Sequence, residues 1–240
     1  LKPLGRSAKD FGETAYKLAL GGCPLIKDDH SLFNQSYAPF KDRVKACVDS
    51  VNNANAKTGG RSLYIANCTA DSMEFLERAM TAQELGAGGI MAAPGLLGLS
   101  IIRELSSAPD FHLPIFLHPC FSGPLVLSAD SGVSPFCYYG QFSRLAGADA
   151  AIFTSFGGRF PFTEEVCRKI CDGTETEMGG LRSIFPVPSG GMKWQLFKKM
   201  VQVYGPDAIF LVGGALLTES DDLTANMHFY FEKLNEAVNK

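Results

Sequence analysis

The sequence lacks the marks of three special classes of protein. No run approaches the roughly 20 apolar residues that a membrane-spanning helix needs, so we expect no membrane contact. There is no basic excess either. Twenty-two Lys and Arg against 25 Asp and Glu leave a net charge of −3, which argues against a nucleic-acid partner. Because 46% of the 240 residues are hydrophobic and 20% are charged, disordered, collagen-like and low-complexity classes are excluded, and the chain is long enough for one large core.

The cysteines lack the even number and the compact spacing of a disulfide scaffold. Seven are spread along the chain, at Cys23, Cys47, Cys68, Cys120, Cys137, Cys167 and Cys171. We therefore expect reduced, mostly buried thiols in a reducing compartment, the cytoplasm.

The start of the chain lacks an initiator Met, a secretory signal and a transit-like arm. It begins at Leu1-Lys2-Pro3, and we interpret this as a position inside a longer chain. An organelle is therefore the alternative to the cytoplasm as the compartment of the protein. No linker, repeat or break in composition divides the sequence, so residues 1–240 are predicted to form one domain.

Strand-like and helix-like segments alternate regularly along the sequence. Short apolar or β-branched runs recur roughly every 25 to 40 residues, the period of one strand plus one helix. The eight runs cover residues 1–3, 25–29, 62–68, 89–94, 114–118, 150–155, 184–188 and 208–212. Helical periodicity marks residues 8–20, 71–85, 162–171, 194–204 and 223–238. Eight such units in about 250 residues predict a (β/α)8 TIM barrel of the α/β class, with a doubly wound open sheet as the alternative.

In a TIM barrel the chemistry takes place where the strands end and the following loops begin. The polar residues at the predicted strand ends are, in order, Lys2, Lys27, Asp28, Asp29, His30, Asn67, His118, Ser155, Arg159, Ser189 and the glycine pairs Gly190-Gly191 and Gly213-Gly214. These are the candidate site residues.

The cluster at the end of the second strand combines a cation, two carboxylates and an imidazole. Alternation along the strand places Lys27 and Asp29 on one face and Asp28 on the other. Mg²⁺ prefers oxygen ligands, and Asp29 supplies one; Lys27 supplies one only if its neutral amine reacts with CO₂ to form a carbamate. The alternative is a Lys–Asp ion pair that caps the strand.

Two glycine turns follow the predicted strands seven and eight. In barrel enzymes such turns often hold a phosphate on backbone N–H groups, because glycine lets the main chain approach an anion closely. Ordinary turns are the alternative for both. Arg159 lies on a glycine-hinged loop after strand six, where it either closes over an anionic substrate or remains a solvated cation.

Several motifs, in this order along the chain, resemble the barrel domain of the ribulose bisphosphate carboxylase (RuBisCO) large chain. They run from residue 1 to about residue 214 and are more similar to the RuBisCO-like proteins, the branch that does not fix carbon. The motifs are Leu1-Lys2-Pro3, Gly21-Gly22 with Lys27-Asp28-Asp29, Tyr64-Ile65-Ala66-Asn67, His118-Pro119 and Val187-Pro188-Ser189-Gly190-Gly191.

The resemblance implies a role for each matching residue. Lys27 matches the lysine that becomes carbamylated, Asp29 matches a Mg²⁺ ligand, and Lys2 matches a lysine that polarises the enediolate. His118 matches an active-site histidine. Arg159 stands where the carboxylases have a lysine on a mobile loop. The candidate substrate- and phosphate-binding residues are Asn67, Arg159, Ser189, Gly190, Gly191, Gly213 and Gly214.

The departures from the family pattern bear on the chemistry. His30 replaces a glutamate that is the third metal ligand, and Mg²⁺ favours imidazole less than carboxylate. Pro119 replaces an arginine that binds one of two phosphates, and Ile152 replaces a histidine at a phosphate site. The second lysine after strand one is missing, and Glu219-Ser220 replaces the usual His-Pro. Loss of one phosphate site predicts a substrate with a single phosphate.

Two functions are compatible with this pattern. The first is an enzyme that enolises a phosphorylated ketose or keto-acid sugar with Mg²⁺, leading to tautomerisation, isomerisation or decarboxylation but not to CO₂ fixation. The alternative is a non-catalytic structural or assembly subunit that has lost its metal. The resemblance also implies an N-terminal domain, absent from this sequence, that completes the site of a neighbouring subunit, and thus at least a homodimer. The substrate and product are not specified by the sequence.

Overall fold

Parallel strands alternate with helices in the computed structural model, which describes residues 1–128, 130–158 and 160–239. The chain divides into two units, and each is treated by itself. The first unit comprises residues 1–91, 110–113 and 216–231, and the second unit comprises the rest of the described chain. The prediction of one domain remains a prediction.

The first unit is built on three parallel strands. They are β1 (Leu25–Lys27), β2 (Leu63–Asn67) and β3 (Gly89–Ala92), whose last residue begins the second unit. Ile26 pairs with Tyr64, and Ala66 pairs with Ile90. The side chains of β3 and most of those of β2 are buried, as expected of a parallel sheet that is covered on both faces.

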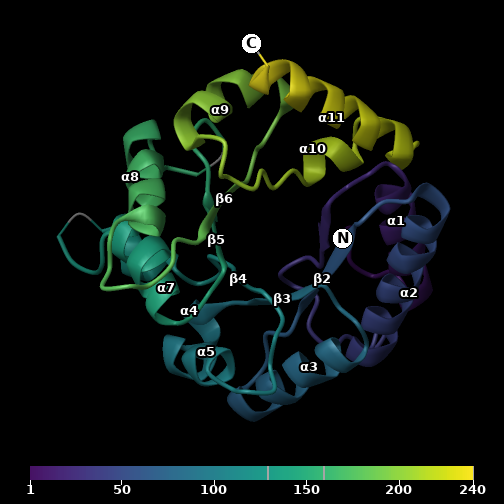
Figure 1. The fold of residues 1–240 in the computed structure, drawn as a ribbon, viewed down its shortest axis with the longest axis horizontal. Helices are drawn as coiled ribbons and strands as arrows, with labels where there is room; N and C mark the ends of the chain where they lie inside the picture. Colours follow the sequence, from purple (N-terminus) through teal and green to yellow (C-terminus); the bar gives the residue numbers. More distant parts are fainter. Residues whose placement is uncertain (129, 159, 240) are drawn as a thin grey trace. The chain divides into compact units, whose positions relative to one another are not determined.

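The first unit contains the helices α1 (Ala8–Leu20), α2 (Phe40–Thr58) and α3 (Ser72–Glu84). In each of them the buried residues recur at helical spacing. Figure 1 shows α1 and α2 side by side. The predicted helix 8–20 is confirmed to the residue, because Ser7 caps its start and Gly21 follows its end. The absence of a side chain at Gly21 admits Met227 of α11 (Leu223–Val238): a Cβ there would lie 2.6 Å from the Met227 Cβ.

Helix α2 was missed by the sequence analysis. Its buried residues recur at helical spacing and are Phe40, Arg43, Val44, Cys47, Val48, Val51 and Ala54. The helix begins after Pro39 and ends at Gly59, which adopts a left-handed φ of +72°. The run of polar residues in its second half, which includes Asn52, Asn53 and Asn55, concealed the apolar face.

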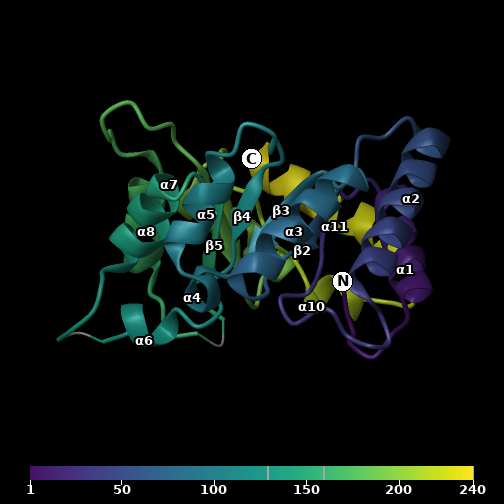
Figure 2. The ribbon, with the colours of Figure 1, turned by 90° about the horizontal axis from the view of Figure 1, so that it is seen from below.

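The second unit contains the other three strands and most of the short helices. The strands are β4 (Ile115–Leu117), β5 (Ala150–Thr154) and β6 (Phe185–Ser189). The helices are α4 (Pro94–Leu97), α5 (Leu99–Ser106), α6 (Gly123–Val126), the π-helix η1 (Phe136–Phe142), α7 (Ser143–Leu145), α8 (Glu164–Glu175), the 3₁₀-helix η2 (Trp194–Leu196), α9 (Phe197–Tyr204) and the start of α10 (Gly214–Leu217). Figure 2 shows α6 apart from the packed helices α5, α7 and α8, on the segment that follows β4.

Two glycines bring η1 and α8 together in this unit. A Cβ at Gly140 would lie 2.3 Å from the Gly173 carbonyl carbon, so only glycine allows this approach. The core beside them is aromatic, with the rings of Tyr139 and Phe153 6.3 Å apart and those of Phe153 and Tyr204 5.9 Å apart.

The predicted α/β class with parallel strands is confirmed, and six of the eight predicted runs form strands. The runs 1–3 and 208–212 do not. The second of these keeps one parallel bridge, between Ser189 and Leu211. The reason lies in β6: Pro186 and Pro188 accept hydrogen bonds from Ile209 and Leu211 but have no N–H to donate in return. β6 therefore has fewer N–H donors for pairing with residues 208–212 than an ordinary strand has.

Two expectations from composition can be compared with the described residues. None of their helices combines the length and the apolar character that a membrane span requires. The seven cysteines, all of which lie in the described part of the chain, form no disulfide.

Candidate active site

In the first unit, three predicted site residues meet at the end of β1. The Lys2 Nζ lies 3.0 Å from Asp29 Oδ2, and the His30 Nδ1 lies 3.7 Å from Asp29 Oδ1. The Ser31 N–H donates to Asp29 Oδ1 at 2.9 Å. Burial raises the pKa of Asp29, but the Ser31 N–H, the Lys2 ammonium and His30 outweigh burial and lower that pKa to about 2. Asp29 is thus a carboxylate that already has a cation against it.

Lys27, the last residue of β1, is the next member of this group. Its Nζ donates to the Asp28 carbonyl at 2.8 Å. Burial lowers the pKa of Lys27 from 10.5 to about 8, and Lys2 adds to this, whereas the nearby Asp29 and Asp28 act in the opposite direction. The neutral amine, which is the form that reacts with CO₂, is therefore far more populated at neutral pH than for an ordinary lysine.

Asp28 points away from this group, as strand alternation predicts. Its carboxylate is fully buried and accepts from the Tyr64 hydroxyl at 2.7 Å, from Arg43 Nε at 3.1 Å and from the Asn67 N–H at 3.0 Å. Arg43 was missed by the sequence analysis. The available signal was a cation on the apolar face of α2, and it went unnoticed because α2 itself was not predicted.

Asn67, the last residue of β2, is fully buried. Its side-chain amide donates to the carbonyls of His30 at 3.0 Å and Leu32 at 3.1 Å, and its Oδ1 accepts from the Thr69 N–H. These bonds hold the loop after β1. The predicted contact of Asn67 with substrate stays a prediction.

In the second unit, His118 follows β4 directly. Its backbone N–H donates to the Ala92 carbonyl at 2.8 Å, and its Nδ1 accepts from the Cys120 N–H at 3.1 Å. Because Nδ1 is an acceptor, the neutral ring carries its proton on Nε2. His118 and the glycine turns belong to the second unit, whereas Lys2, Lys27, Asp29 and His30 belong to the first.

The turn after β6 requires its glycines. Gly190 and Gly191 have φ values of +82° and +81°, which residues other than glycine rarely adopt. The Ser189 hydroxyl donates to the Phe153 carbonyl at 2.8 Å. Gly158, on the loop after β5, packs so closely that a Cβ there would lie 2.6 Å from the Gly190 oxygen. The neighbouring Arg159 lies outside the described residues.

The turn around Gly213 and Gly214 is more open. A Cβ at either position would meet no heavy atom within 4 Å, and Gly214 begins the four-residue helix α10. Open space therefore lies beside the main chain at these two glycines, and their predicted contact with phosphate stays a prediction.

The side chains at the end of β1 offer only part of the ligand set that a divalent cation needs. Among the described residues no group of three or more His, Cys, Asp or Glu is placed to hold a metal ion. Asp29 offers an oxygen ligand and His30 offers a nitrogen ligand. The Lys2 ammonium, which contacts Asp29 Oδ2, shows that a positive charge fits beside this oxygen. A third donor arises only when Lys27 carries a carbamate, so the set fits a divalent cation in that modified form.

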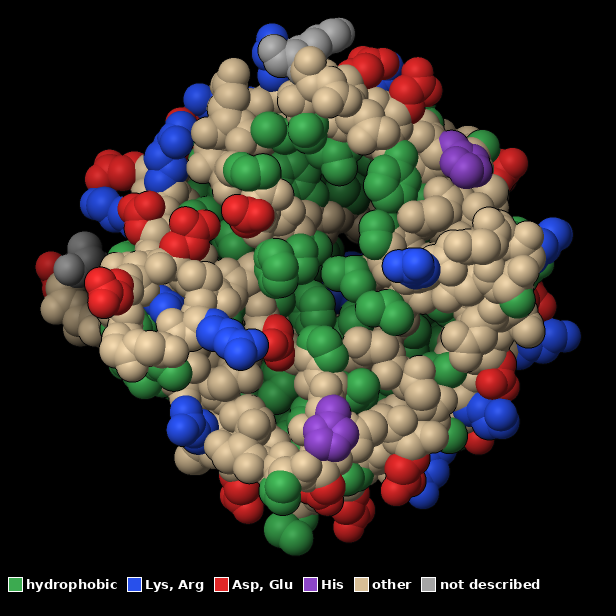
Figure 3. All heavy atoms as spheres, in the orientation of Figure 1, with side chains coloured by type: hydrophobic (Ala, Val, Ile, Leu, Met, Phe, Trp, Pro, Cys, Tyr) green, Lys and Arg blue, Asp and Glu red, His purple; other side chains and the backbone are tan. Residues whose placement is uncertain are grey.

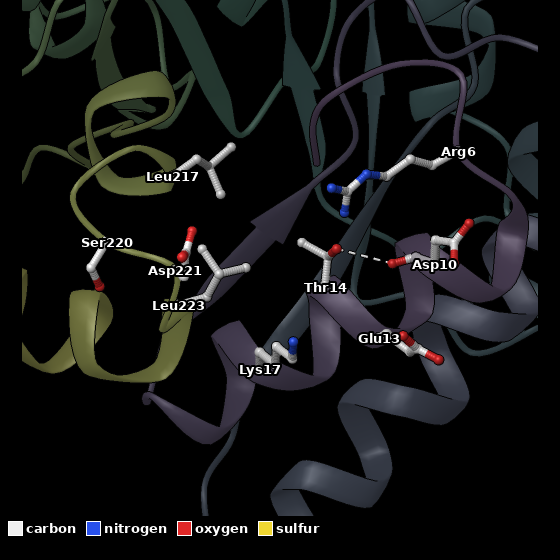
Figure 4. Close-up of a pocket in the computed structure, with 9 residues that line it drawn as sticks. All are labelled: Arg6, Asp10, Glu13, Thr14, Lys17, Leu217, Ser220, Asp221 and Leu223. Atoms are coloured by element: carbon white, nitrogen blue, oxygen red, sulfur yellow. Dashed lines mark hydrogen bonds between the residues drawn. The ribbon is translucent and has the colours of Figure 1, made fainter.

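A separate pocket lies in the first unit, and it contains none of the predicted site residues. It has a volume of about 520 Å³ and is lined by Arg6, Asp10, Glu13, Thr14, Lys17, Leu217, Ser220, Asp221 and Leu223. Figure 4 shows the Arg6 side chain extending from the segment before α1 toward Leu217, and the Thr14 hydroxyl donating to the Asp10 carbonyl at 2.9 Å. The lining mixes charges of both signs. The face drawn in Figure 3 likewise intersperses acidic and basic side chains.

The comparisons with known proteins identify the family of the chain. A sequence model described as "Ribulose bisphosphate carboxylase large chain, catalytic domain" matches residues 1–226. The chain belongs to the RuBisCO large-chain family. The predicted resemblance to the RuBisCO-like proteins is also confirmed by its relatives.

Three of these relatives define where the chain stands within the RuBisCO family. It is 36% identical over 228 residues to the 5-methylthioribulose-1-phosphate isomerase of Rhodospirillum rubrum, and the match covers 93% of this chain and 58% of that protein. It is 34% identical over 213 residues to the 2,3-diketo-5-methylthiopentyl-1-phosphate enolase of Geobacillus thermodenitrificans, and the match covers 89% of this chain and 52% of that protein. The Rubisco-like protein from Rhodopseudomonas palustris superimposes with a TM-score of 0.88 at 30% identity, over 98% of this chain and 62% of that one. The chain thus spans little more than half of the length of these RuBisCO-like relatives.

Proposed function

We propose that the protein enolises a phosphorylated ketose or keto-acid sugar and does not fix CO₂. Two relatives are named for an isomerase and an enolase that act on 5-methylthio sugar phosphates, and neither name denotes a carboxylase. The replacement of the family arginine by Pro119 supports a substrate with a single phosphate. A five-carbon sugar phosphate of this kind is the proposed substrate class.

The observation that carries this proposal is the contact between Lys2 and Asp29 at 3.0 Å, with Lys27 on the same strand end. Enolisation removes a proton next to a carbonyl and leaves negative charge on the oxygens of an enediolate. We assign the stabilisation of that charge to the Lys2 ammonium, which is half-exposed and lies 3.0 Å from Asp29 Oδ2. The proton is taken up by the carbamate on Lys27 or by a base from a neighbouring subunit.

We include Mg²⁺ in the proposal, held by Asp29, His30 and a carbamate on Lys27. The chemistry that Mg²⁺ supplies when bound is stabilisation of negative charge on the substrate oxygens. A cation bound here would share the Asp29 carboxylate with the Lys2 ammonium, which lies 3.0 Å from Oδ2. Because His30 is a nitrogen donor in place of the family glutamate, we expect weaker Mg²⁺ binding than a second carboxylate would give.

For the second unit by itself, we propose that main-chain N–H groups bind a phosphate-like anion. Gly190 and Gly191 follow Ser189 at the end of β6, and Gly213 and Gly214 precede α10. The left-handed φ values of the first pair support the assignment, since successive N–H groups in such turns form anion-binding concavities. The substrate contacts of His118 and Arg159 that the resemblance implies stay predictions.

The proposal extends to the architecture and the assembly. We propose that the chain has the (β/α)8 barrel fold, supported by its six parallel strands and by the TM-score of 0.88 over nearly the whole chain. The full-length protein is proposed to be at least a homodimer, because the RuBisCO resemblance implies that each site is completed by a neighbouring subunit.

The test uses the full-length gene product, purified with Mg²⁺ and bicarbonate. It is incubated in D₂O with 2,3-diketo-5-methylthiopentyl-1-phosphate or 5-methylthioribulose-1-phosphate, and deuterium entry at the carbon next to the carbonyl is followed by NMR. We expect exchange with the native protein, a loss of at least about 100-fold for Lys2→Met, and native rates for Lys9→Met, which alters an exposed lysine of α1. Absence of exchange with both substrates would refute the proposed chemistry.

A second function, the non-catalytic subunit, is favoured by one observation. His30 stands in place of the glutamate, so the unmodified side chains give only two donors. Metal uptake discriminates between the two functions. Carbamate-dependent Mg²⁺ uptake that is lost in Lys27→Ala supports the enzyme, and no uptake at any CO₂ concentration supports the subunit.

A further inference from the structure

The loop that follows β1 is held from the protein interior by two buried side chains. Arg43 and Asn67 are both fully buried, and their donors face backbone carbonyls between residues 30 and 38. We propose that Arg43 and Asn67 are positioning residues that fix Asp29 and His30 for cation binding. The inference rests on the proposed function.

The contacts of Arg43 divide between a charge and the loop. Its Nε donates to Asp28 Oδ2 at 3.1 Å, which ties α2 to the residue between Lys27 and Asp29. The other guanidinium nitrogens donate to the carbonyls of Ala38 at 3.1 Å and Phe33 at 3.1 Å, with a longer bond to Leu32 at 3.4 Å. One planar group thus fixes both ends of the segment 28–38.

Asn67 holds the middle of the same segment. Its amide donates to the carbonyls of His30 and Leu32 at 3.0 and 3.1 Å, and its backbone N–H donates to Asp28 Oδ2 at 3.0 Å. The carbonyls turn inward to these donors, while the His30 side chain is 40% exposed. The buried donors therefore set which side chains the loop presents outward.

This geometry cannot be reproduced by a simple positive charge. A lysine at position 43 keeps the charge opposite Asp28, but it loses the planar fork that reaches three carbonyls at once. Groups that orient metal ligands typically change metal affinity 10- to 100-fold when they are altered. We therefore expect Arg43→Lys to weaken cation binding by about that factor even where the fold survives.

The experiment measures two quantities on the same proteins. Mn²⁺ binding with saturating bicarbonate is followed by electron paramagnetic resonance, and hydrogen exchange is followed by mass spectrometry for peptides that cover residues 28–38. The variants are Arg43→Lys, Asn67→Asp and the milder Tyr64→Phe, which removes only the hydroxyl that donates to Asp28. The matched control is Arg144→Lys. Arg144 is also buried and donates to the carbonyls of Leu181 at 2.8 Å and Arg182 at 2.9 Å, in the second unit.

The expected result is faster exchange in residues 28–38 and Mn²⁺ binding weakened about 10- to 100-fold in Arg43→Lys and Asn67→Asp, with native values in Arg144→Lys. Native exchange and affinity in Arg43→Lys overturn the inference, as does an equal loss of affinity in Arg144→Lys. If Arg43→Lys does not fold, Tyr64→Phe and Asn67→Asp decide by the same criteria. If the native protein binds no Mn²⁺, the proposed function fails, and the exchange of residues 28–38 alone decides whether these residues hold the loop.

Discussion

Opposing effects act on single side chains at the end of β1. Burial disfavours the charged forms of both Lys27 and Asp29. For Asp29 the Ser31 N–H and the Lys2 ammonium more than offset the effect of burial, so its pKa is lowered. For Lys27 the carboxylates of Asp28 and Asp29 offset burial only in part, so its pKa is also lowered. The pair therefore combines a firmly ionised carboxylate with an amine that loses its proton unusually easily.

The first prediction concerns the Lys2–Asp29 contact. Replacing Lys2 by Met removes the ammonium at 3.0 Å, so the pKa of Asp29 should rise from about 2 toward the ordinary value of 3.8. Carboxyl-detected NMR titration measures this directly. Lys9→Met serves as the control and should leave Asp29 unchanged. An unaltered Asp29 titration in Lys2→Met would show that the ion pair does not form in solution.

At the scale of elements, local signals in the sequence decide where helices begin. The side chain of Ser7 accepts from the Asp10 N–H, and the Asp10 carboxylate accepts from the Ser7 N–H, which satisfies two donors at the start of α1. This reciprocal cap explains why the predicted boundary at residue 8 is confirmed.

The second prediction follows from that cap. Ser7→Ala should lower the free energy of unfolding by about 1 kcal/mol, because the N–H of Asp10 loses its acceptor. Ser7→Asn keeps an acceptor at the same position and should stay within a few tenths of a kcal/mol of the native protein. Urea denaturation followed by circular dichroism measures both. Equal losses in the two variants would contradict the capping role.

The third prediction concerns the approach of the loops after β5 and β6. Gly158→Ala would place a methyl group 2.6 Å from the Gly190 oxygen, so the turn must shift. We expect inorganic phosphate to bind several-fold more weakly, as measured by calorimetry. Gly123→Ala, whose Cβ would meet only a Leu127 methyl at 3.5 Å, should bind as the native protein does. Native affinity for phosphate in Gly158→Ala would show that the contact between Gly158 and Gly190 does not contribute to anion binding.

At the scale of the whole molecule, the depressed pKa of Lys27 links stability to pH. Between pH 8 and 10.5 the unfolded chain holds a proton on Lys27 that the folded chain has released. Because the unfolded state binds more protons in this window, the contribution of Lys27 to stability rises with pH there.

The fourth prediction uses this linkage. Lys27→Met removes the cost of burying the ammonium, so below pH 8 the variant should be more stable than the native protein. The advantage should shrink as the pH rises from 8 to 10.5. Chemical denaturation at a series of pH values gives the difference. A constant difference across this window would mean that Lys27 titrates like an ordinary lysine.

The sequence by itself determined the α/β class, six of the strands, the boundaries of α1 and α11 and the family, because these depend on local periodicity, capping and motifs with fixed spacing. Lys2 and His30 both contact Asp29 at this strand end, and the roles predicted for these residues stay predictions. Only the tertiary structure decided the hydrogen bonds of Arg43 and Asn67, the contact of Gly158 with Gly190 and the weak pairing of residues 208–212. Each of these depends on atoms brought together from distant parts of the chain, and hydrogen bonds of that kind leave no periodic trace in a sequence.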